Sequence, residues 1–220
     1  MSSLSPKIQP VILAAGDSSR MGYPKALLPL GEETFVTRIL STLERSGFAQ
    51  PSVVLGADAP RIMAALEGRR AAVIVNPHPE RGQSFSLQLA LERIPPAACA
   101  CLVWPVDHPA VTGKLLRDLV RLFADSGADA ALPRCGLRRG HPAIFGRRIF
   151  PELLALPPGV SVKRLLHDRA LHIAELPTAE GAAVEDIDTP DDYYRLTGEE
   201  LEAALARRGI SWTRRAPAGA

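Results

Sequence analysis

The chain contains, near its amino end, the stretch Val11-Ile-Leu-Ala-Ala-Gly-Asp-Ser-Ser-Arg-Met-Gly-Tyr-Pro-Lys25. Residues 8–15 form an apolar run, which is typical of a buried strand in a parallel sheet. A polar loop begins at Gly16, directly after this run. Ligands of open α/β sheets bind outside the carboxyl ends of the strands, so this order of strand and loop predicts a ligand beside Gly16.

The loop has the composition of a phosphate-binding site. Gly16 and Gly22 allow a close backbone approach, so that successive amide N–H groups can point at phosphate oxygens. Arg20 and Lys25 add positive charge, the first as a planar fork and the second as a point charge. Five residues separate the two glycines and a Tyr-Pro pair precedes the lysine, which excludes the Walker loop. The chain also lacks G-x-G-x-x-G, which argues against a dinucleotide-binding dehydrogenase.

Strand-like and helix-like segments alternate along the chain. Apolar runs cover residues 8–15, 52–56, 71–75 and 100–105, and segments of helical period cover 33–47, 59–68, 84–93 and 112–125. Shorter apolar runs follow at 129–133, 142–146 and 170–176, with helices expected at 147–155, 161–168 and 190–207. This alternation predicts a single α/β domain, a three-layer Rossmann-like fold with a mostly parallel twisted sheet. We assign residues 1–207 to this domain and expect 208–220 to form a flexible tail.

The composition is close to electrical neutrality. Among the 220 residues, 26 Lys and Arg oppose 24 Asp and Glu, and the net charge of +2 gives no field that would demand nucleic acid. No apolar run reaches the roughly 18–20 residues of a membrane-spanning helix, and residues 1–10 lack the apolar core of a secretory signal. We therefore expect a cytoplasmic protein that binds neither nucleic acid nor a membrane.

Two minor features of the composition bear on possible sites. Cys99, Cys101 and Cys135 lack the spacing of a metal-binding cluster, and we expect three free thiols. A basic cluster covers residues 134–148 and includes three glycines. It is compatible with a solvated face or with a site for a local anionic ligand, and the sequence leaves both open.

The first acidic candidate is Asp107, in Leu102-Val-Trp-Pro-Val-Asp-His-Pro109. A triphosphate site needs a divalent cation such as Mg²⁺ to neutralise and align the phosphates, and carboxylates are suitable ligands. Asp107 lies at the end of an apolar strand, where ligands collect. Thr112 is a suitable N-cap for the helix that follows, which weakens a purely structural role for Asp107.

The second acidic segment is Glu185-Asp-Ile-Asp-Thr-Pro-Asp-Asp192. In an extended chain Asp186 and Asp188 lie on one face, so both can approach the same cation. We favour Asp188, although the sequence does not separate the two. Thr189 and the proline after it form a helix start in which the last two acids are favourable, so we expect structural roles for those acids.

Residues 13–25 closely resemble the signature L-A-A-G-x-S-x-R-M-G-x-x-K of the nucleotidyltransferases, and within them the molybdenum cofactor cytidylyltransferase and guanylyltransferase group. The resemblance extends over about residues 8–196 and implies the fold of the nucleotide-diphospho-sugar transferases. Asp107 matches the D-x-P element, and residues 186–192 match D-I-D-T-P-x-D. The resemblance therefore implies Mg²⁺ ligands at Asp107 and at Asp188 or Asp186, and catalytic roles for Lys25, Arg20 and Asp107. The nucleotide-binding residues that it implies in the first motif are Leu13, Ala14, Ala15, Gly16, Ser18, Arg20 and Lys25.

Three further segments bear on the substrates. Residues 76–86 are similar to the stretch N-P-x-x-x-x-G-x-x-x-S, which implies that Gly82 and Ser86 lie beside the nucleotide. Residues 140–145 match G-H-P-x-x-F, which implies that Gly140 and His141 bind the acceptor. Residues 14–16 resemble the A-A-G form of the cytidylyl-transferring members, and Ala15 would crowd a purine, so we favour CTP over GTP. Residues 158–166 lack the Asp of the family's G-D-x-G-A-R-x-L-L stretch and shift its basic residue, which leaves the acceptor open.

The resemblance implies transfer of a nucleoside monophosphate from a triphosphate to a phosphate-bearing acceptor such as molybdopterin, with release of pyrophosphate. A phosphate monoester is largely dianionic at neutral pH, so no general base is needed. A molybdoenzyme or its maturation chaperone is a further expected partner. Two alternatives remain: a sugar phosphate or other phospho-metabolite as acceptor, and a nucleotide-binding maturation factor without turnover.

Overall fold

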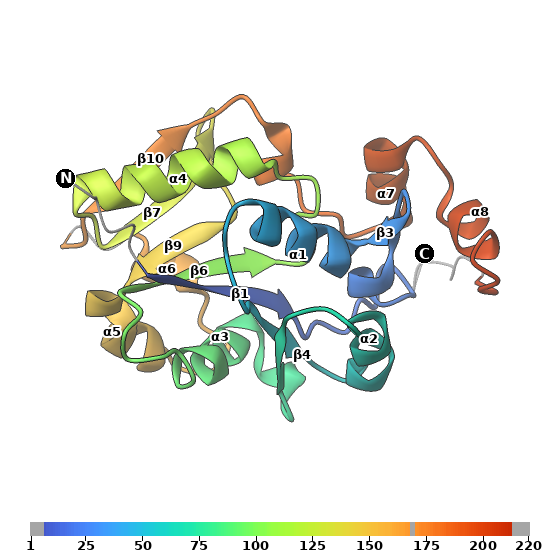
Figure 1. Cartoon of the computed structure of the whole chain (residues 1–220), viewed down its shortest axis with the longest axis horizontal. Coiled ribbons are helices and arrows are strands. Elements are labelled where there is room, and N and C mark those ends of the chain that lie inside the picture. The colour runs from blue at the N-terminus through green and yellow to red at the C-terminus, as the bar shows by residue number, and fades with distance from the viewer. Residues whose placement is uncertain (1–6, 168–169, 213–220) are drawn as a thin grey trace.

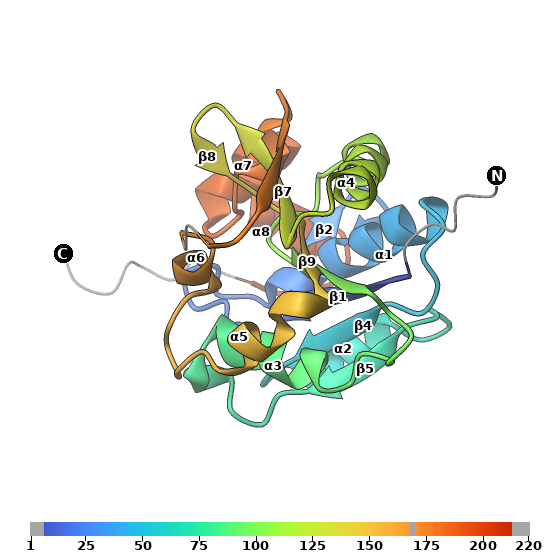
Figure 2. The ribbon, with the colours of Figure 1, turned by 90° about the vertical axis from the view of Figure 1, so that its left-hand side faces the viewer.

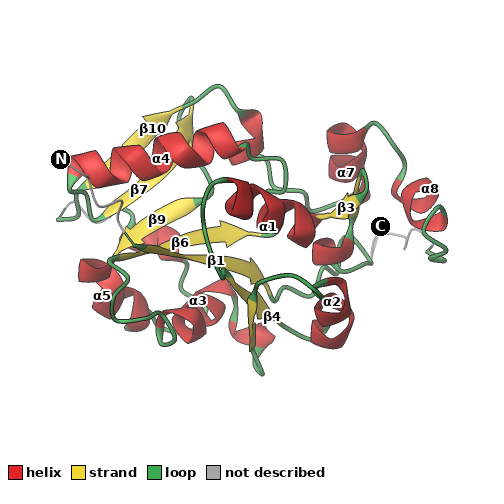
Figure 3. Ribbon diagram, in the orientation of Figure 1, coloured by secondary structure: helices red, strands yellow, loops and turns green. Residues whose placement is uncertain are grey.

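The computed structural model describes residues 7–167 and 170–212, which build one twisted central sheet with helices on both faces (Figures 1 and 3). The main sheet has the order β10-β7-β9-β6-β1-β4-β5, and a short strand, β8, pairs with β7. The bounds of its strands, in that order and then β8, are Ile173–Pro177, Ala130–Cys135, Ala143–Gly146, Ala100–Pro105, Ile8–Ala14, Ser52–Leu55, Ala72–Val75 and Arg138–Arg139. This architecture confirms the predicted α/β class.

The sheet is parallel except around β9 and the short strand β8, which pairs antiparallel with β7. Strand β1 pairs in parallel with β4 and β6, and β10 pairs in parallel with β7. Strand β9 runs antiparallel to both of its neighbours, β6 and β7. Leu13 of β1 lies in register with Pro105 of β6, and the amide of Val106 donates to the Leu13 carbonyl at 3.0 Å. The loops that carry Gly16 and Asp107 therefore leave the sheet side by side.

The two faces of β1 belong to two different hydrophobic cores. Ile12 and Ala14 pack with α1 (Phe35–Arg45) and α4 (Gly113–Ser126) on one face. Val11 and Leu13 pack with α3 (Gln83–Leu91) and α5 (Phe150–Leu154) on the other (Figure 2). This alternation follows from the two-residue period of a strand, and it makes β1 a buried strand with the first motif at its carboxyl end.

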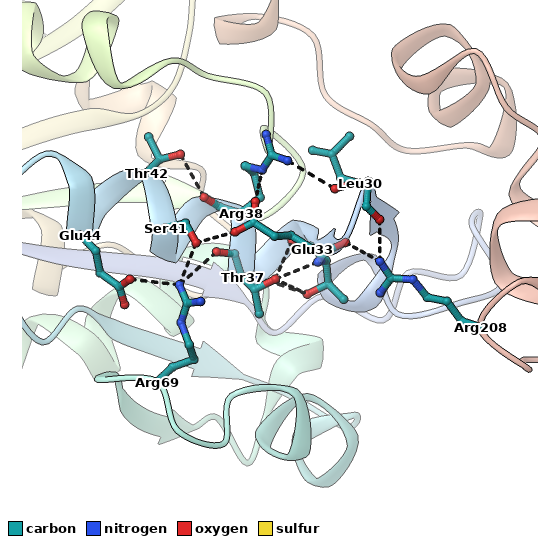
Figure 4. A network of polar contacts seen from close by, with 11 residues as sticks. Leu30, Glu33, Thr37, Arg38, Ser41, Thr42, Glu44, Arg69 and Arg208 are labelled. Carbon is teal, nitrogen blue, oxygen red and sulfur yellow. Dashed lines mark hydrogen bonds and ion pairs between the residues drawn. The ribbon is translucent and has the colours of Figure 1, made fainter.

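The remaining elements surround the carboxyl edge of the sheet. They are a hairpin of β2 (Pro29–Leu30) and β3 (Glu33–Thr34), and the helices α2 (Ala59–Ala65), α6 (Val162–Leu165), α7 (Pro190–Thr197) and α8 (Leu201–Ala206). Polar contacts of Glu33, Arg38 and Ser41 join the hairpin to α1, and Arg69 donates to Ser41 and Glu44 (Figure 4). The hairpin that follows the first motif is thereby tied to α1.

Several boundaries differ from the prediction. The single helix expected over 190–207 is two helices, because the chain leaves α7 at Gly198 with a left-handed backbone, φ 72°. Residues 208–212 of the expected tail contact the domain, whereas 213–220 lie outside the described residues. The three cysteines are free. Within 7–167 and 170–212, no helix combines the length and the apolar character needed to cross a membrane.

Candidate functional site

A cavity of about 550 Å³ opens at the carboxyl ends of β1 and β6. It collects eleven of the residues singled out in the sequence. They are Leu13, Ala14, Ala15, Gly16, Ser18, Arg20, Lys25, Gly82, Ser86, Asp107 and Asp188. The remaining three, Gly140, His141 and Asp186, line a neighbouring cavity of about 480 Å³.

The glycine-containing loop is folded on itself through Ser18. The carbonyl of Ser18 accepts the amides of Met21 and Gly22 at 3.0 and 2.9 Å, and its hydroxyl accepts the amide of Lys25 at 3.0 Å. Ser18 and Gly22 both have a positive φ, 53° and 69°. Because the amides of Met21 and Gly22 are bonded within the loop, these two do not face a ligand. The positive charge of the loop comes from Arg20 and Lys25.

The two basic residues of the loop meet both acidic segments. Lys25 Nζ lies 3.4 Å from Asp107 Oδ2 and is hydrogen-bonded to Asp188 Oδ1. Arg20 Nη2 lies 2.7 Å from Asp188 Oδ2. The Lys25 and Asp188 side chains are only 15% and 18% exposed, whereas Arg20 is 67% exposed. Lys25 is therefore the central cation of the cluster, and Arg20 is an outer, solvent-screened one.

Asp188 is held in place and in its charged form. Burial raises the pKa of its carboxyl, but the hydrogen bond and charge of Lys25 and the charge of Arg20 outweigh this, and the pKa falls below its ordinary value. The amide of Asp188 donates to Asp192 Oδ2 at 3.1 Å. Asp192 and Thr189 form a capping box at the start of α7, which agrees with the structural role expected for Asp192.

Asp107 and Asp188 fit a cation that is shared with phosphates. The Oδ1 atom of Asp107 is buried and has no hydrogen-bond partner within the described residues, and Nε2 of His108 lies 3.8 Å away. Among 7–167 and 170–212 there is no cluster of three or more metal-ligating side chains. Mg²⁺ characteristically binds one or two carboxylates and completes its shell with phosphate oxygens and water, so a pair of carboxylates is sufficient.

The structure places Asp186 and Asp188, which the sequence did not distinguish, in different cavities. The amide of Ile187 donates to the Asp107 carbonyl at 3.0 Å, which fixes the acidic segment beside the end of β6. Asp188 then turns toward Lys25 and the first cavity, and Asp186 lines the second. Asp107 itself lines both cavities, so it lies at their junction.

The second cavity contains basic residues that the sequence analysis did not assign. Lys163, Arg138 and Arg139 line it, together with His108. Lys163 belongs to the stretch 158–166, where the sequence departs from the family pattern, and the two arginines belong to the basic cluster at 134–148. These two arginines of the basic cluster therefore face a cavity. The only sequence signal for Lys163 was the shifted basic residue.

The loop that carries His141 has a tightly determined backbone. The amide of Gly140 donates to the Pro133 carbonyl at 2.8 Å, and the amide of His141 donates to the Ala183 carbonyl at 2.7 Å. A Cβ atom at Gly140 would lie 2.2 Å from that Ala183 oxygen, so only glycine fits. The bond between His141 and the next residue, Pro142, is cis. The glycine of the sequence G-H-P is thus required by the local geometry.

His141 is uncharged in this setting. Burial, followed by the positive charges of His108 and Lys163, lowers the pKa of His141 to about 3. Its Nδ1 atom is buried and finds no partner among the described residues, and its ring centroid lies 5.0 Å from that of His108. At neutral pH His141 can form hydrogen bonds to a ligand in the second cavity but cannot attract it by charge.

Comparison with known proteins places these features in a family. The profile of the MobA-like NTP transferase domain matches residues 10–174. The chain is 30% identical to a nicotine blue oxidoreductase of Paenarthrobacter nicotinovorans, over 87% of this chain and 97% of that protein. It is also 30% identical to a molybdenum cofactor guanylyltransferase of Xanthomonas euvesicatoria, over 86% and 94%.

Solved structures agree with this assignment. The fold is similar to the crystal structure of Rv0371c from Mycobacterium tuberculosis H37Rv in complex with manganese, with a TM-score of 0.76 and 30% identity. The similarity covers 88% of this chain and 99% of that one. The chain belongs to the family of the MobA-like NTP transferase domain, and it is a nucleotidyltransferase by family.

Proposed function

We propose that the protein transfers CMP from CTP to the phosphate of a small-molecule acceptor, of which molybdopterin or the molybdenum cofactor is the foremost example, and releases pyrophosphate. The observation that carries this proposal is the junction of two cavities at Asp107. One cavity carries the phosphate-binding loop, and the other carries a separate basic lining. Such a pair is what a reaction between a triphosphate and an anionic acceptor requires.

The first cavity supplies the donor site. Lys25 and Arg20 would exchange their carboxylate partners for phosphate oxygens when the triphosphate binds. Asp107 and Asp188 would hold a divalent cation, for which we propose Mg²⁺. The manganese in the related Rv0371c structure supports a divalent cation in this family. When bound, the cation neutralises charge on the phosphates and aligns them.

The choice of CTP rests on Ala15. A Cβ atom on Gly56 would lie 2.4 Å from the Ala15 carbonyl, so the backbone at Ala15 is packed against the next strand's end and is not free to retreat. Ala15 lines the first cavity, and we propose that its methyl group leaves less room for the base than a glycine would. A pyrimidine fits this boundary better than a purine.

The second cavity supplies the acceptor site. Lys163 and Arg138 provide charge for a phosphate, whereas the neutral His141 provides a hydrogen bond to an uncharged part of the acceptor. The guanylyltransferase relative acts on the molybdenum cofactor by its name, which supports an acceptor of this class. A molybdoenzyme or its maturation chaperone in the cytoplasm remains the proposed protein partner.

In the proposed reaction an oxygen of the acceptor phosphate attacks the α-phosphorus of CTP. A bond forms between that oxygen and the phosphorus, and the bond from the α-phosphorus to the bridging oxygen breaks, so that pyrophosphate leaves with the electron pair. The nucleophile is already ionised, since its second pKa is near 6. The protein's part is to orient the two phosphates and to neutralise charge that develops on the leaving group, through Lys25 and Arg20.

Pyrophosphate release from each of CTP, GTP, ATP and UTP tests the proposal directly. We expect release that depends on Mg²⁺ and on molybdopterin or molybdenum cofactor, with CTP as the best donor. Release with a sugar phosphate instead would support the alternative acceptor. Binding of CTP without release, in the presence of every acceptor and of Mg²⁺ or Mn²⁺, would contradict transfer and favour the nucleotide-binding maturation factor.

A further inference from the structure

The chain reverses direction after α8 and returns to the first motif. Gly209 has φ 72°, its amide donates to the Ala206 carbonyl at 2.9 Å, and the amide of Ile210 donates to the Leu205 carbonyl at 3.0 Å. These two bonds with a left-handed glycine form a Schellman motif, which ends a helix with a defined turn. Ile210 and Trp212 are partly buried and pack against the first hydrophobic core. Residues 208–212 thus follow a defined path back to the domain.

This segment ends on the phosphate-binding loop. A Cβ atom on Gly22 would lie 3.3 Å from Nε1 of Trp212 and 3.9 and 4.0 Å from two further indole atoms. The indole therefore covers the face of Gly22, two residues after Arg20. Its Nε1 is buried and has no hydrogen-bond partner among the described residues.

The same segment also holds the hairpin that follows the loop. Arg208 Nη2 donates to the carbonyls of Gly31 and Glu33 at 2.8 and 2.9 Å (Figure 4). Figure 1 shows α8 near α7 and β3 at one end of the molecule. Trp212 and Arg208 thus contact the chain on both sides of Lys25, at Gly22 and at Gly31.

The loop needs such outside support. Residues 16, 17, 19 and 20 are exposed, and three of the loop's own bonds depend on the single residue Ser18. Arg20 and Lys25 can act together on a triphosphate only while the backbone between them keeps its form. The indole of Trp212 packs against that backbone at Gly22.

We propose that residues 208–212 are a positioning element of the nucleotide site. Trp212 holds Gly22 in place, and this keeps Arg20 and Lys25 in the arrangement that binds the triphosphate. The inference rests on the proposed nucleotidyl transfer. Trp212 does not line the cavity and touches no reacting atom, so it is not a catalytic residue. Its effect passes through Arg20 and Lys25, which bind the triphosphate and neutralise the charge that develops on the leaving group.

The test compares Trp212→Ala and Trp212→Phe with two controls, Tyr194→Ala and a chain that ends at Trp212. Tyr194 is an aromatic residue of α7 that is 49% exposed. We expect Trp212→Ala to raise KM for CTP and the Kd of CTP with Mg²⁺, measured calorimetrically, by about tenfold. We expect kcat to fall as well, because Arg20 and Lys25 also neutralise the charge that develops on the leaving group. The controls should leave both constants unchanged.

Trp212→Phe and fluorescence provide a readout that does not need turnover. The only other tryptophan is Trp104, which is fully buried in the core. Addition of CTP with Mg²⁺ should change the emission of the parent chain and not that of Trp212→Phe. The phenylalanine variant should recover part or all of the affinity that alanine loses, since it retains apolar contact with Gly22.

The outcomes separate this inference from the proposed function. If no acceptor supports pyrophosphate release but Trp212→Ala weakens CTP binding, the proposed transfer fails and the positioning role stands. If the parent chain is active and Trp212→Ala binds CTP equally well, the positioning role is overturned. An equal loss in the chain that ends at Trp212, or in Tyr194→Ala, would also overturn it.

Discussion

Replacing Asp188 by Asn should separate catalysis from stability at the centre of the site. The carboxylate accepts charge-assisted hydrogen bonds from Lys25 and Arg20, and such bonds contribute about 1.5–3 kcal/mol when shielded. The Arg20 bond is largely exposed and contributes about 1 kcal/mol or less. The Asn side chain keeps an acceptor oxygen, and Lys25 keeps its ion pair with Asp107 at 3.4 Å. We therefore expect the free energy of unfolding to fall by about 1–3 kcal/mol in urea denaturation.

The same change should reduce kcat/KM for nucleotidyl transfer by at least about 100-fold, which corresponds to about 2.7 kcal/mol of transition-state stabilisation. A domain with a typical stability of about 5–15 kcal/mol stays almost fully folded after a loss of 1–3 kcal/mol. Unfolding therefore cannot account for the lost activity. Pyrophosphate release at saturating Mg²⁺ is the assay.

Asp192→Asn is the matched control, four residues away. Asp192 belongs to the capping box of α7 and pairs with Arg195, and Asn keeps the acceptor for the amide of Asp188. We expect a stability loss of about 0.5–2 kcal/mol with kcat/KM retained within about threefold. If Asp192→Asn and Asp188→Asn lost activity equally, or if Asp188→Asn kept it, the assignment of Asp188 to the cation would be refuted.

The lowered pKa of Asp188 adds a dependence on pH. Because the folded state holds the proton less tightly than the unfolded chain, the stabilisation is complete above the unfolded pKa of about 4. It is lost as the pH falls through the lower pKa of the folded state. The stability difference between the parent chain and Asp188→Asn should therefore be constant from about pH 5 upward and shrink below about pH 4.

Three further predictions concern the second cavity. His141→Gln should flatten the dependence of the unfolding free energy on pH between pH 6.5 and about 3. In the parent chain this free energy falls as the pH is lowered, by up to about 1.4 kcal/mol per pH unit, because the unfolded chain binds a proton at His141 and the folded chain does not. Urea titrations of both chains at several pH values would show the difference. Lys163→Ala should raise KM for the acceptor about tenfold and leave KM for CTP unchanged, and equal effects on both substrates would contradict a separate acceptor site. Gly140→Ala should cost about 1–3 kcal/mol in thermal or urea unfolding, since the new methyl group would press on the Ala183 carbonyl, and unchanged stability would show that the loop can yield.

Much of the fold follows from local sequence patterns. The apolar run at 8–15 and the polar loop after it suffice to predict a buried parallel strand with a cavity at its carboxyl end. Thr112 caps α4 through its side chain, and the Thr-Pro start predicted at 189 is the capping box of α7. These features depend on residues close together in the chain, whose propensities no tertiary contact overrides.

The features that sequence reasoning missed depend on contacts between distant segments. Strand β9 runs antiparallel because β8 forms a short hairpin with β7 before it, and nothing in residues 142–146 states a direction. The alternation of side chains along an extended segment places Asp186 and Asp188 on the same face, so it does not say which of them is a metal ligand. Only the hydrogen bond from Ile187 to Asp107 assigns each acid to its cavity. The Ala/Arg/Pro/Gly composition after Arg207 resembles a frayed end, although Trp212 reaches Gly22.

The most direct test of the account is a crystal of the protein with a non-hydrolysable CTP analogue and Mn²⁺, with anomalous scattering used to locate the metal. We expect one strong peak between Asp107 and Asp188, about 2.1–2.2 Å from a carboxylate oxygen of each, with the Lys25 ammonium moved onto a phosphate. A nucleotide bound in the first cavity with the metal elsewhere, or with Lys25 still paired to Asp188, would contradict the central claim.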